Sequence, residues 1–317
     1  MSSQTQNPIM RDIALFAALG VLVLVIFVSQ GAVYSVRMLV EAGCYGIIAL
    51  GLTIQWGYAG LFNVGIMGFI AAGAASSMLM TFPRNPDFWN SGGPELAGLF
   101  IVKLIACALA LWLANNSNRW GVGPRLRALL ITIAIAVSYL VLSFHMTVMS
   151  EEIEKASGWM GGLGLPVFFG WIIAGVIAGI IAWFVGKICL GLRSDYLAIA
   201  TLGIAQIIKH FLKNADWLTN GTLTVSPMPW PVPSPADGEF LFARAAYLSV
   251  VAVALLITYL LLQRAYHSPW GRMMRAIRDN EEAAGAMGKN VNRRRLEIFI
   301  LGCVLMGIGG AMLIHFT

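Results

Sequence analysis

The side chains best suited to bind a solute lie inside an apolar part of the chain, where polar residues and glycines alternate closely. They are Gln55, Gly57, Tyr58, Gly60, Asn63 and Gly65. Glycines allow a helix to break, and a broken helix exposes backbone N–H and C=O groups that a membrane tolerates only inside protein or beside a water-filled path. The segment therefore predicts a polar lining of a solute pathway. The alternative is close helix packing through small residues.

A second polar segment runs from Arg193 to Gln206. Ser194 or Asp195 can cap the N-terminus of a helix, and Thr201 and Gln206 would then face an interior path. Asp195 could instead pair with Arg193 at the membrane–water interface.

A third segment, which precedes the last apolar run, is charged and amphipathic. Met274, Ile277, Ala284 and Met287 can share one apolar helical face, with arginines on the other, as two short helices with a break at Gly288. Such a segment is either a docking element for a soluble partner or an interfacial helix resting on anionic lipid. The candidate docking residues are Arg275, Arg278, Glu282, Ala283, Ala284 and Gly288.

Patterns for covalent chemistry are absent from the sequence. It contains no G-x-S-x-G, H-E-x-x-H or Walker sequence, so we expect neither an enzyme nor a resident cofactor or metal. The four cysteines form no CxxC pair and are expected to be small buried hydrophobes. Ionisable residues in or near apolar runs are candidates for substrate or coupling roles. These are Glu41, Lys103, His145, Lys209 and His315.

The elements that must position these groups are membrane helices. Of 317 residues, 58% are hydrophobic and only 11% are charged, whereas a soluble domain has about 25% charged residues. Because a spanning helix needs about 20 apolar residues, we predict an all-α polytopic bundle of about eight spans. One further helix, residues 196–211, is expected to be re-entrant or buried in protein. The eight spans are Ile13–Val36, two within Ala42–Pro83 joined near Trp56–Gly60, Leu96–Ala114, Ala128–Ser150, Leu165–Gly186, Ala245–Gln263 and Ile298–Thr317.

The basic residues predict the orientation. The net charge is +6, and most of the 21 Lys and Arg residues fall on one side of this arrangement, which favours a cytoplasmic N-terminus. The acidic cluster at residues 151–154 and the proline-rich stretch Pro227–Pro235 would then face outward. Charges in short loops between apolar runs favour contacts with lipid and protein partners over nucleic acid.

Three blocks of the chain, in order, resemble the inner-membrane permease subunit of bacterial branched-chain amino acid ABC transporters. They are Gly57–Ala74 with its GYAGL run, Arg193–Gly203 with R-x-DY-x-AI-x-TLG, and Gly271–Gly288 with the EAA-x-x-x-G pattern. Asn63 stands where the family often has serine.

The resemblance implies a single transmembrane permease domain over residues 1–317, in which the loop 271–290 couples to ATPase subunits. It also implies a second, homologous permease, two ATP-binding subunits and a periplasmic substrate-binding protein, at the bacterial cytoplasmic membrane. The expected function is import of branched-chain amino acids. The alternatives are import of urea or short amides, or a carrier that works without an ATPase. Since relatives usually continue past Gly309–Ala311, further C-terminal helices are expected to be missing from this sequence.

Overall fold

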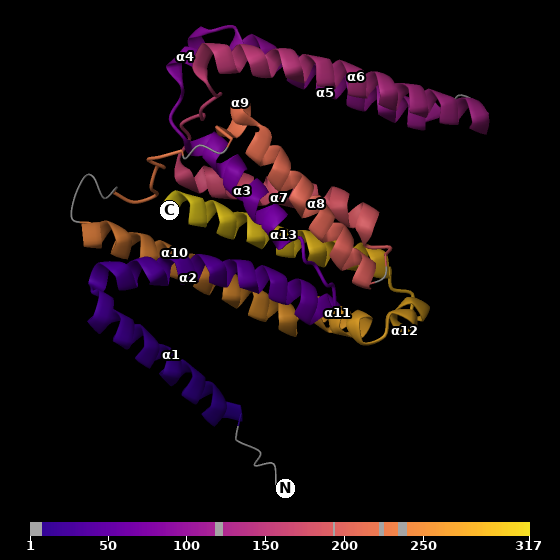
Figure 1. Cartoon of the computed structure of the whole chain (residues 1–317). Coiled ribbons are helices and arrows are strands. Elements are labelled where there is room, and N and C mark those ends of the chain that lie inside the picture. Colours follow the sequence, from indigo (N-terminus) through magenta and orange to yellow (C-terminus); the bar gives the residue numbers. More distant parts are fainter. Residues whose placement is uncertain (1–7, 118–122, 193, 222–224, 234–239) are drawn as a thin grey trace. The chain divides into compact units, whose positions relative to one another are not determined.

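The computed structural model describes residues 8–117, 123–192, 194–221, 225–233 and 240–317 (Figure 1). Within these ranges the chain forms helices and a single isolated β-bridge, between Arg84 and Gly161. This confirms the predicted all-α class. The helices are α1 (Pro8–Gln30), α2 (Ala32–Thr53), the π-helical turn η1 (Ile54–Tyr58), α3 (Ile66–Thr81), α4 (Pro86–Asn90), α5 (Gly93–Asn115), α6 (Pro124–Ser157), α7 (Val167–Cys189), α8 (Ser194–Asn214), α9 (Asp216–Thr219), α10 (Phe240–His267), α11 (Pro269–Asp279), α12 (Glu281–Ala286) and α13 (Val291–Phe316).

Seven helices of the described part are long and apolar enough to cross a membrane. They are α1, α2 continued through η1, α5, α6, α7, α10 and α13. The sequence predicts eight, because it counts residues 42–83 as two spans. The second of these, α3, has only 16 residues and extends about 24 Å, which is short of the roughly 30 Å hydrocarbon core.

A glycine separates the first two helices. Gly31 has φ 85°, a left-handed conformation that favours glycine, so α1 ends at Gln30 and α2 begins at Ala32. The predicted end of the first span at Val36 was therefore wrong. Hydropathy does not detect a backbone turn between two apolar stretches.

Helix α8 is longer than predicted. It has 21 residues and includes the polar end that the hydropathy pattern leaves out. Its burial is confined to the face that carries Leu197, Thr201 and Ala205, whereas Ile199 and Ile207 are exposed. This helix is therefore neither short nor buried on all sides.

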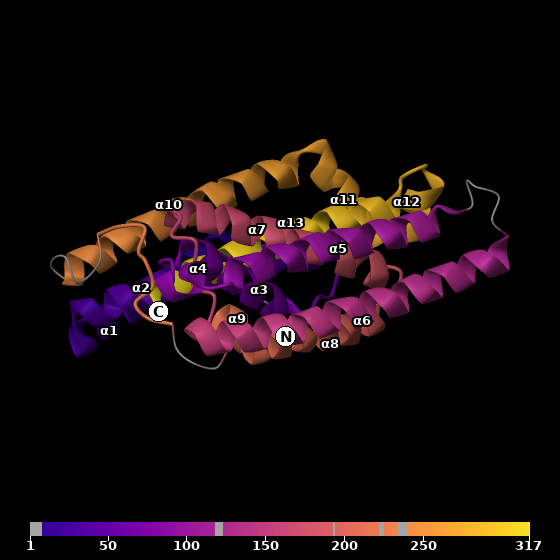
Figure 2. The ribbon, with the colours of Figure 1, turned by 90° about the horizontal axis from the view of Figure 1, so that it is seen from above.

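The chain divides into two compact units. The first comprises residues 1–78, 166–208 and 227–317, and its central element is α13, which lies along α7 and α2, while α2 lies along α10 (Figures 1 and 2). Close approach depends on glycines of α13: Gly302 meets Gly51, and Gly307 meets Gly73 and Ala178. Small residues at helix crossings of this kind are typical of membrane proteins.

The second unit comprises residues 79–165 and 209–226. Its two long helices, α5 and α6, lie side by side (Figure 1). A small core of Phe88, Met149, Ile153 and Trp217 joins α4, α6 and α9. Between the long helices, Lys103 Nζ lies 3.0 Å from His145 Nδ1.

Replacement of Gly307 by valine is expected to destabilise the first unit. A Cβ at this position would lie 2.5 Å from the Ala178 Cβ and 3.0 Å from the Ala174 carbonyl oxygen, so α13 and α7 must separate, at a cost of about 1–3 kcal/mol. The matched control is Gly203→Val in α8, where a Cβ meets nothing within 4 Å. Thermal unfolding of both variants in detergent measures the difference. Equal melting temperatures would contradict the packing argument.

Candidate functional site

The glycine-rich segment forms a true interruption of a membrane helix. Helix α2 widens into η1, and the backbone is non-helical from Gly60 to Val64 before α3 begins. Gly60 has φ 65°, and its N–H donates to the Trp56 carbonyl oxygen over 3.1 Å. The predicted turn near residues 56–60 is thus present, and it extends further along the chain than expected.

Two buried side-chain amides fill this interruption. Gln55 Nε2 donates to the carbonyl oxygen of Phe299 (2.8 Å) and to Cys303 Sγ (3.2 Å). Asn63 Nδ2 donates to Gln55 Oε1 over 2.9 Å, and Asn63 Oδ1 accepts from the Gly65 N–H over 2.9 Å. Gln55 and Asn63 are both buried, so this chain alone satisfies and covers them.

Helix α8 covers the other side of the interruption. Thr201 Oγ1 accepts from the Val64 N–H over 3.3 Å and donates to the Ala198 carbonyl oxygen over 3.0 Å. A Cβ at Gly65 would overlap the backbone of Thr201, so glycine is required for this approach. Gln206 is exposed and lies about 140° around the helix from Thr201, because five residues turn a helix by about 500°. The structure does not bring Gln206 to the cluster.

Tyr58 points to a different neighbour. Its hydroxyl lies 3.5 Å from the Leu262 carbonyl oxygen, and its ring lies 5.0 Å from that of Tyr266. Arg275 stacks over the same Tyr266 ring at 4.0 Å. Tyr58 therefore connects the end of η1 to α10 and to the following amphipathic segment.

A direct bond joins the amphipathic segment to the interruption. Arg278 Nη1 of α11 donates to the carbonyl oxygen of Gly57 over 2.5 Å. A Cβ at Gly60 would lie 3.1 Å from Arg278 Cγ, so the arginine stem passes close to the turn. Because the helix is irregular here, the carbonyl group of Gly57 lacks its usual helical hydrogen bond, and Arg278 supplies a charged donor in its place.

The amphipathic segment consists of two helices that break at Asn280. Asn280 Oδ1 caps α12 by accepting from the Ala283 N–H over 2.9 Å, and Gly288, with φ 75°, lies beyond the helix end. The break predicted at Gly288 is therefore the end of the second helix. Met274, Ile277 and Ala284 are buried as predicted.

Met287 departs from that prediction, since its side chain is 80% exposed. Met287 follows Ala286, the last residue of α12, so the helical periodicity that buries Ala284 does not extend to it. Glu282 and Ala283 are also exposed. The outer surface of α12 is thus available to a partner.

Four of the five candidate ionisable residues of the apolar runs have partners within the protein. Glu41 pairs with Arg37 at 2.9 Å, and His315 Nδ1 lies 2.8 Å from the Pro229 carbonyl oxygen. His145 joins Lys103 in the second unit, while Lys209 is exposed. The possible pairing of Asp195 with Arg193 lies outside the described residues. In the part of the chain that is described, no three His, Cys, Asp or Glu residues are grouped to hold a metal ion.

Sequence reasoning missed the α13 side of the cluster. Cys303 was expected to be an inert buried thiol, and the Phe299 carbonyl group carries no sequence signal at all. The available signal was indirect: Gly302 lies between them, and a Cβ there would lie 2.6 Å from Gln55 Cγ.

Comparison with known proteins gives concordant matches. A family model described as "Branched-chain amino acid transport system / permease component" matches residues 34–164 and 146–317. The high-affinity branched-chain amino acid transport system permease protein LivM of Escherichia coli is 29% identical over 160 residues, which is 44% of this chain and 38% of that protein. The probable branched-chain amino acid transport permease protein LivM of Methanocaldococcus jannaschii is 22% identical over 284 residues, which is 87% of this chain and 65% of that protein.

One relative is named for a different substrate, a sugar. The xylose transport system permease protein XylH of Escherichia coli is 25% identical over 321 aligned positions, covering 94% of this chain and 70% of that protein. The chain spans between 38% and 65% of the length of the LivM relatives. No solved structure matches it significantly.

Replacement of Gln55 by leucine is expected to destabilise the first unit, because the buried Asn63 amide group loses its acceptor, Gln55 Oε1. Each buried group left unsatisfied costs about 1–3 kcal/mol. The control is Gln206→Leu, the same change at an exposed position of α8, which is expected to leave the unfolding temperature nearly unchanged. Thermal unfolding in detergent compares the two. An equal response would refute the view that Gln55 closes the interruption.

Proposed function

Because this chain belongs to the family of permease components of branched-chain amino acid transport systems, we propose that it is the membrane-spanning subunit of an ABC importer for these amino acids. Separate subunits would hydrolyse ATP. The seven long apolar helices support the membrane location, and the named relatives are transport permeases, not enzymes.

The observation that carries the proposal is the bond from Arg278 to Gly57. It connects the exposed α11–α12 segment, with its EAA-x-x-x-G pattern, to the interruption of α2. A rigid short helix that is displaced by a partner transmits that displacement to whatever its side chains hold. Movement of α11 would therefore pull on the carbonyl group of Gly57 and act on the buried Gln55–Asn63 pair.

In the proposed cycle, closure of two ATP-binding subunits displaces this coupling segment. The interruption then opens, and a path lined by Gln55, Tyr58, Asn63, Thr201 and Gln206 becomes accessible to substrate. Gly57, Gly60 and Gly65 would supply the backbone freedom. Because Gln206 is exposed on α8, we place it toward the second, homologous permease that such an assembly contains.

The proposed topology keeps the N-terminus in the cytoplasm and the coupling segment on the same side of a bacterial cytoplasmic membrane. A periplasmic binding protein would deliver substrate to the opposite face, where the stretch from Pro227 lies. Residues 234 and 235 of that stretch lie outside the described part of the chain. We treat residues 1–317 as one permease domain in this scheme.

A sugar is the second candidate substrate, and the similarity to the xylose permease over 94% of this chain favours it. The buried amides of Gln55 and Asn63 can hydrogen-bond to either an amino acid or a sugar. Uptake by the complete assembly in proteoliposomes, with leucine, urea and xylose as parallel substrates, separates the candidates. ATP-dependent accumulation of xylose or urea without leucine would overturn the amino acid assignment.

Replacement of Glu282 by lysine is expected to remove retention of the ATP-binding subunits. Glu282 is exposed at the start of α12, so its charge can be reversed without disturbing the core. A pull-down of the chain in detergent measures retention, and Glu154→Lys, at an exposed position of α6, is the matched control. Unchanged retention and normal uptake by the Glu282 variant would remove α12 from the ATPase interface.

Gly288→Arg tests the same interface, but this change adds a large side chain and also strains the backbone. Gly288 has φ 75° and open space around a Cβ, so arginine fits sterically but strains the backbone by about 1 kcal/mol or more. We expect weaker retention of the ATP-binding subunits with only a small loss of thermal stability. Collapse of the fold would show that the glycine is structural.

Replacement of Arg278 by glutamine is expected to uncouple transport while leaving subunit retention intact. The variant keeps the exposed surface of α12 and loses the charged donor to Gly57. We expect ATP hydrolysis to continue and ATP-driven uptake to fall about tenfold or more, on the scale of a lost charge-assisted hydrogen bond. Arg272→Gln on the same helix, whose side chain bonds to the His267 carbonyl oxygen, is the control. Parallel uptake rates for both variants would contradict the linkage.

A further inference from the structure

A cavity of about 480 Å³ lies within the first unit, apart from the Gln55–Asn63 pair. Its walls come from the interruption at Gly60 and Leu61, from the turn after α7, from the start of α12 and from the start of α13. Ligand pockets in proteins commonly have volumes of about 300–1,000 Å³. The cavity can therefore hold a small organic molecule.

Charges of both signs line one wall. Arg295 of α13 and Glu281 of α12 form an ion pair, with Arg295 Nη1 2.7 Å from Glu281 Oε2. Among the described residues, the buried Nε of Arg295 has no hydrogen-bond partner. Asn292 lines the same cavity one turn earlier on α13, so a carboxylate placed there would meet a guanidinium and an amide.

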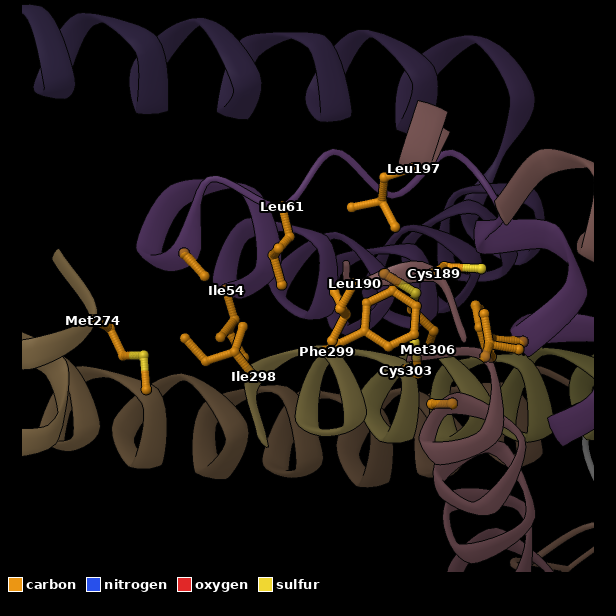
Figure 3. Packing of buried hydrophobic residues seen from close by; sticks show 14 of the residues in the cluster. Ile54, Leu61, Cys189, Leu190, Leu197, Met274, Ile298, Phe299, Cys303 and Met306 are labelled. Carbon is orange, nitrogen blue, oxygen red and sulfur yellow. The ribbon is translucent and has the colours of Figure 1, made fainter. Parts of the chain in front are cut away.

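Apolar side chains also line the cavity. Leu61, Leu190 and Leu197 line the cavity and belong to the buried hydrophobic cluster that contains Phe299 (Figure 3). Leu61 comes from the interruption, Leu190 from the turn that follows α7, and Leu197 from helix α8. An isolated phosphate or a metal ion would make no use of these leucines.

We propose that this cavity is a binding site for a small zwitterionic α-amino acid with an apolar side chain. The ligand carboxylate binds Arg295 and Asn292, its ammonium group binds Glu281, and its side chain packs on the leucines. A simple anion is disfavoured because Glu281 lies beside the guanidinium. Bound ligand would join α12 to α13 and to the interruption, and so would restrain the proposed coupling segment.

The choice of leucine as the ligand rests on the proposed function, whereas the zwitterion class rests on the lining of the cavity. Isothermal titration of the full chain in detergent with L-leucine tests both. We expect 4-methylpentanoate, which lacks the ammonium group, and 3-methylbutylamine, which lacks the carboxylate, to bind at least tenfold more weakly than L-leucine.

Variants locate the binding. Arg295→Gln and Glu281→Gln are each expected to weaken leucine binding at least tenfold. Arg293→Gln, an exposed neighbour on α13 that pairs with Glu297 outside the cavity, should bind as the wild type does. Equal leucine affinity in all three variants would overturn the site, and so would absence of leucine binding to the folded wild type.

A variant that fills the cavity separates loss of binding from loss of the fold. Gly191 lines the cavity and has open space around a Cβ, so Gly191→Phe is expected to fold, retain the ion pair and lose binding. Gly203→Phe in α8, also at an open position, is its control. Leucine uptake by the assembly without binding in the cavity would overturn this inference alone. Binding in the cavity without amino acid uptake would overturn the proposed function alone.

Discussion

The first unit depends on the closure of one interrupted membrane helix. Where α2 loses its regular helical hydrogen bonds, backbone N–H and C=O groups are left without helical partners, and lipid offers them none. Side chains supply the missing bonds: Asn63 accepts from Gly65, Thr201 accepts from Val64, and Arg278 donates to Gly57. Of these three bonds, only the Asn63–Gly65 bond is buried, and a buried group left unsatisfied costs about 1–3 kcal/mol, so this bond contributes most to keeping the interruption closed. A segment that is closed by side chains can also be opened by moving them.

The glycines of α13 make that closure possible. Gln55 reaches the Phe299 carbonyl oxygen only because Gly302 has no side chain, and α3 and α7 approach the same helix at Gly307. The same glycines of α13 thus allow both the close packing of the helices and the hydrogen bonds that close the interruption. The two interpretations of the glycine-rich segment, as a packing surface and as a polar pathway lining, do not exclude each other in this structure.

Sequence patterns could predict what depends on local composition. They identify the membrane class, most of the long helices, the broken segment and the amphipathic segment before α13. They cannot predict contacts that depend on rotation about a helix axis or on a distant backbone. Thr201 and Gln206 look alike in sequence, yet only Thr201 reaches the interruption. Met287 fits the apolar periodicity of its neighbours, but α12 ends at Ala286, one residue before it, and its side chain is exposed. The carbonyl acceptor at Phe299 could not be predicted, because every residue has one.

Four arginines of the amphipathic segment and of early α13 bind other groups of the protein. Arg278 holds Gly57, Arg275 covers Tyr266, Arg295 pairs with Glu281, and Arg294 pairs with Glu297. The outward surface of α12 is left with Glu282, Ala283 and Met287. A positive charge count alone would assign this region to anionic lipid. Arg272 and Arg293 remain exposed, but the other four bind groups of the protein, which agrees with the proposed role in which a partner displaces α12 and α11 passes the movement to the helix interruption.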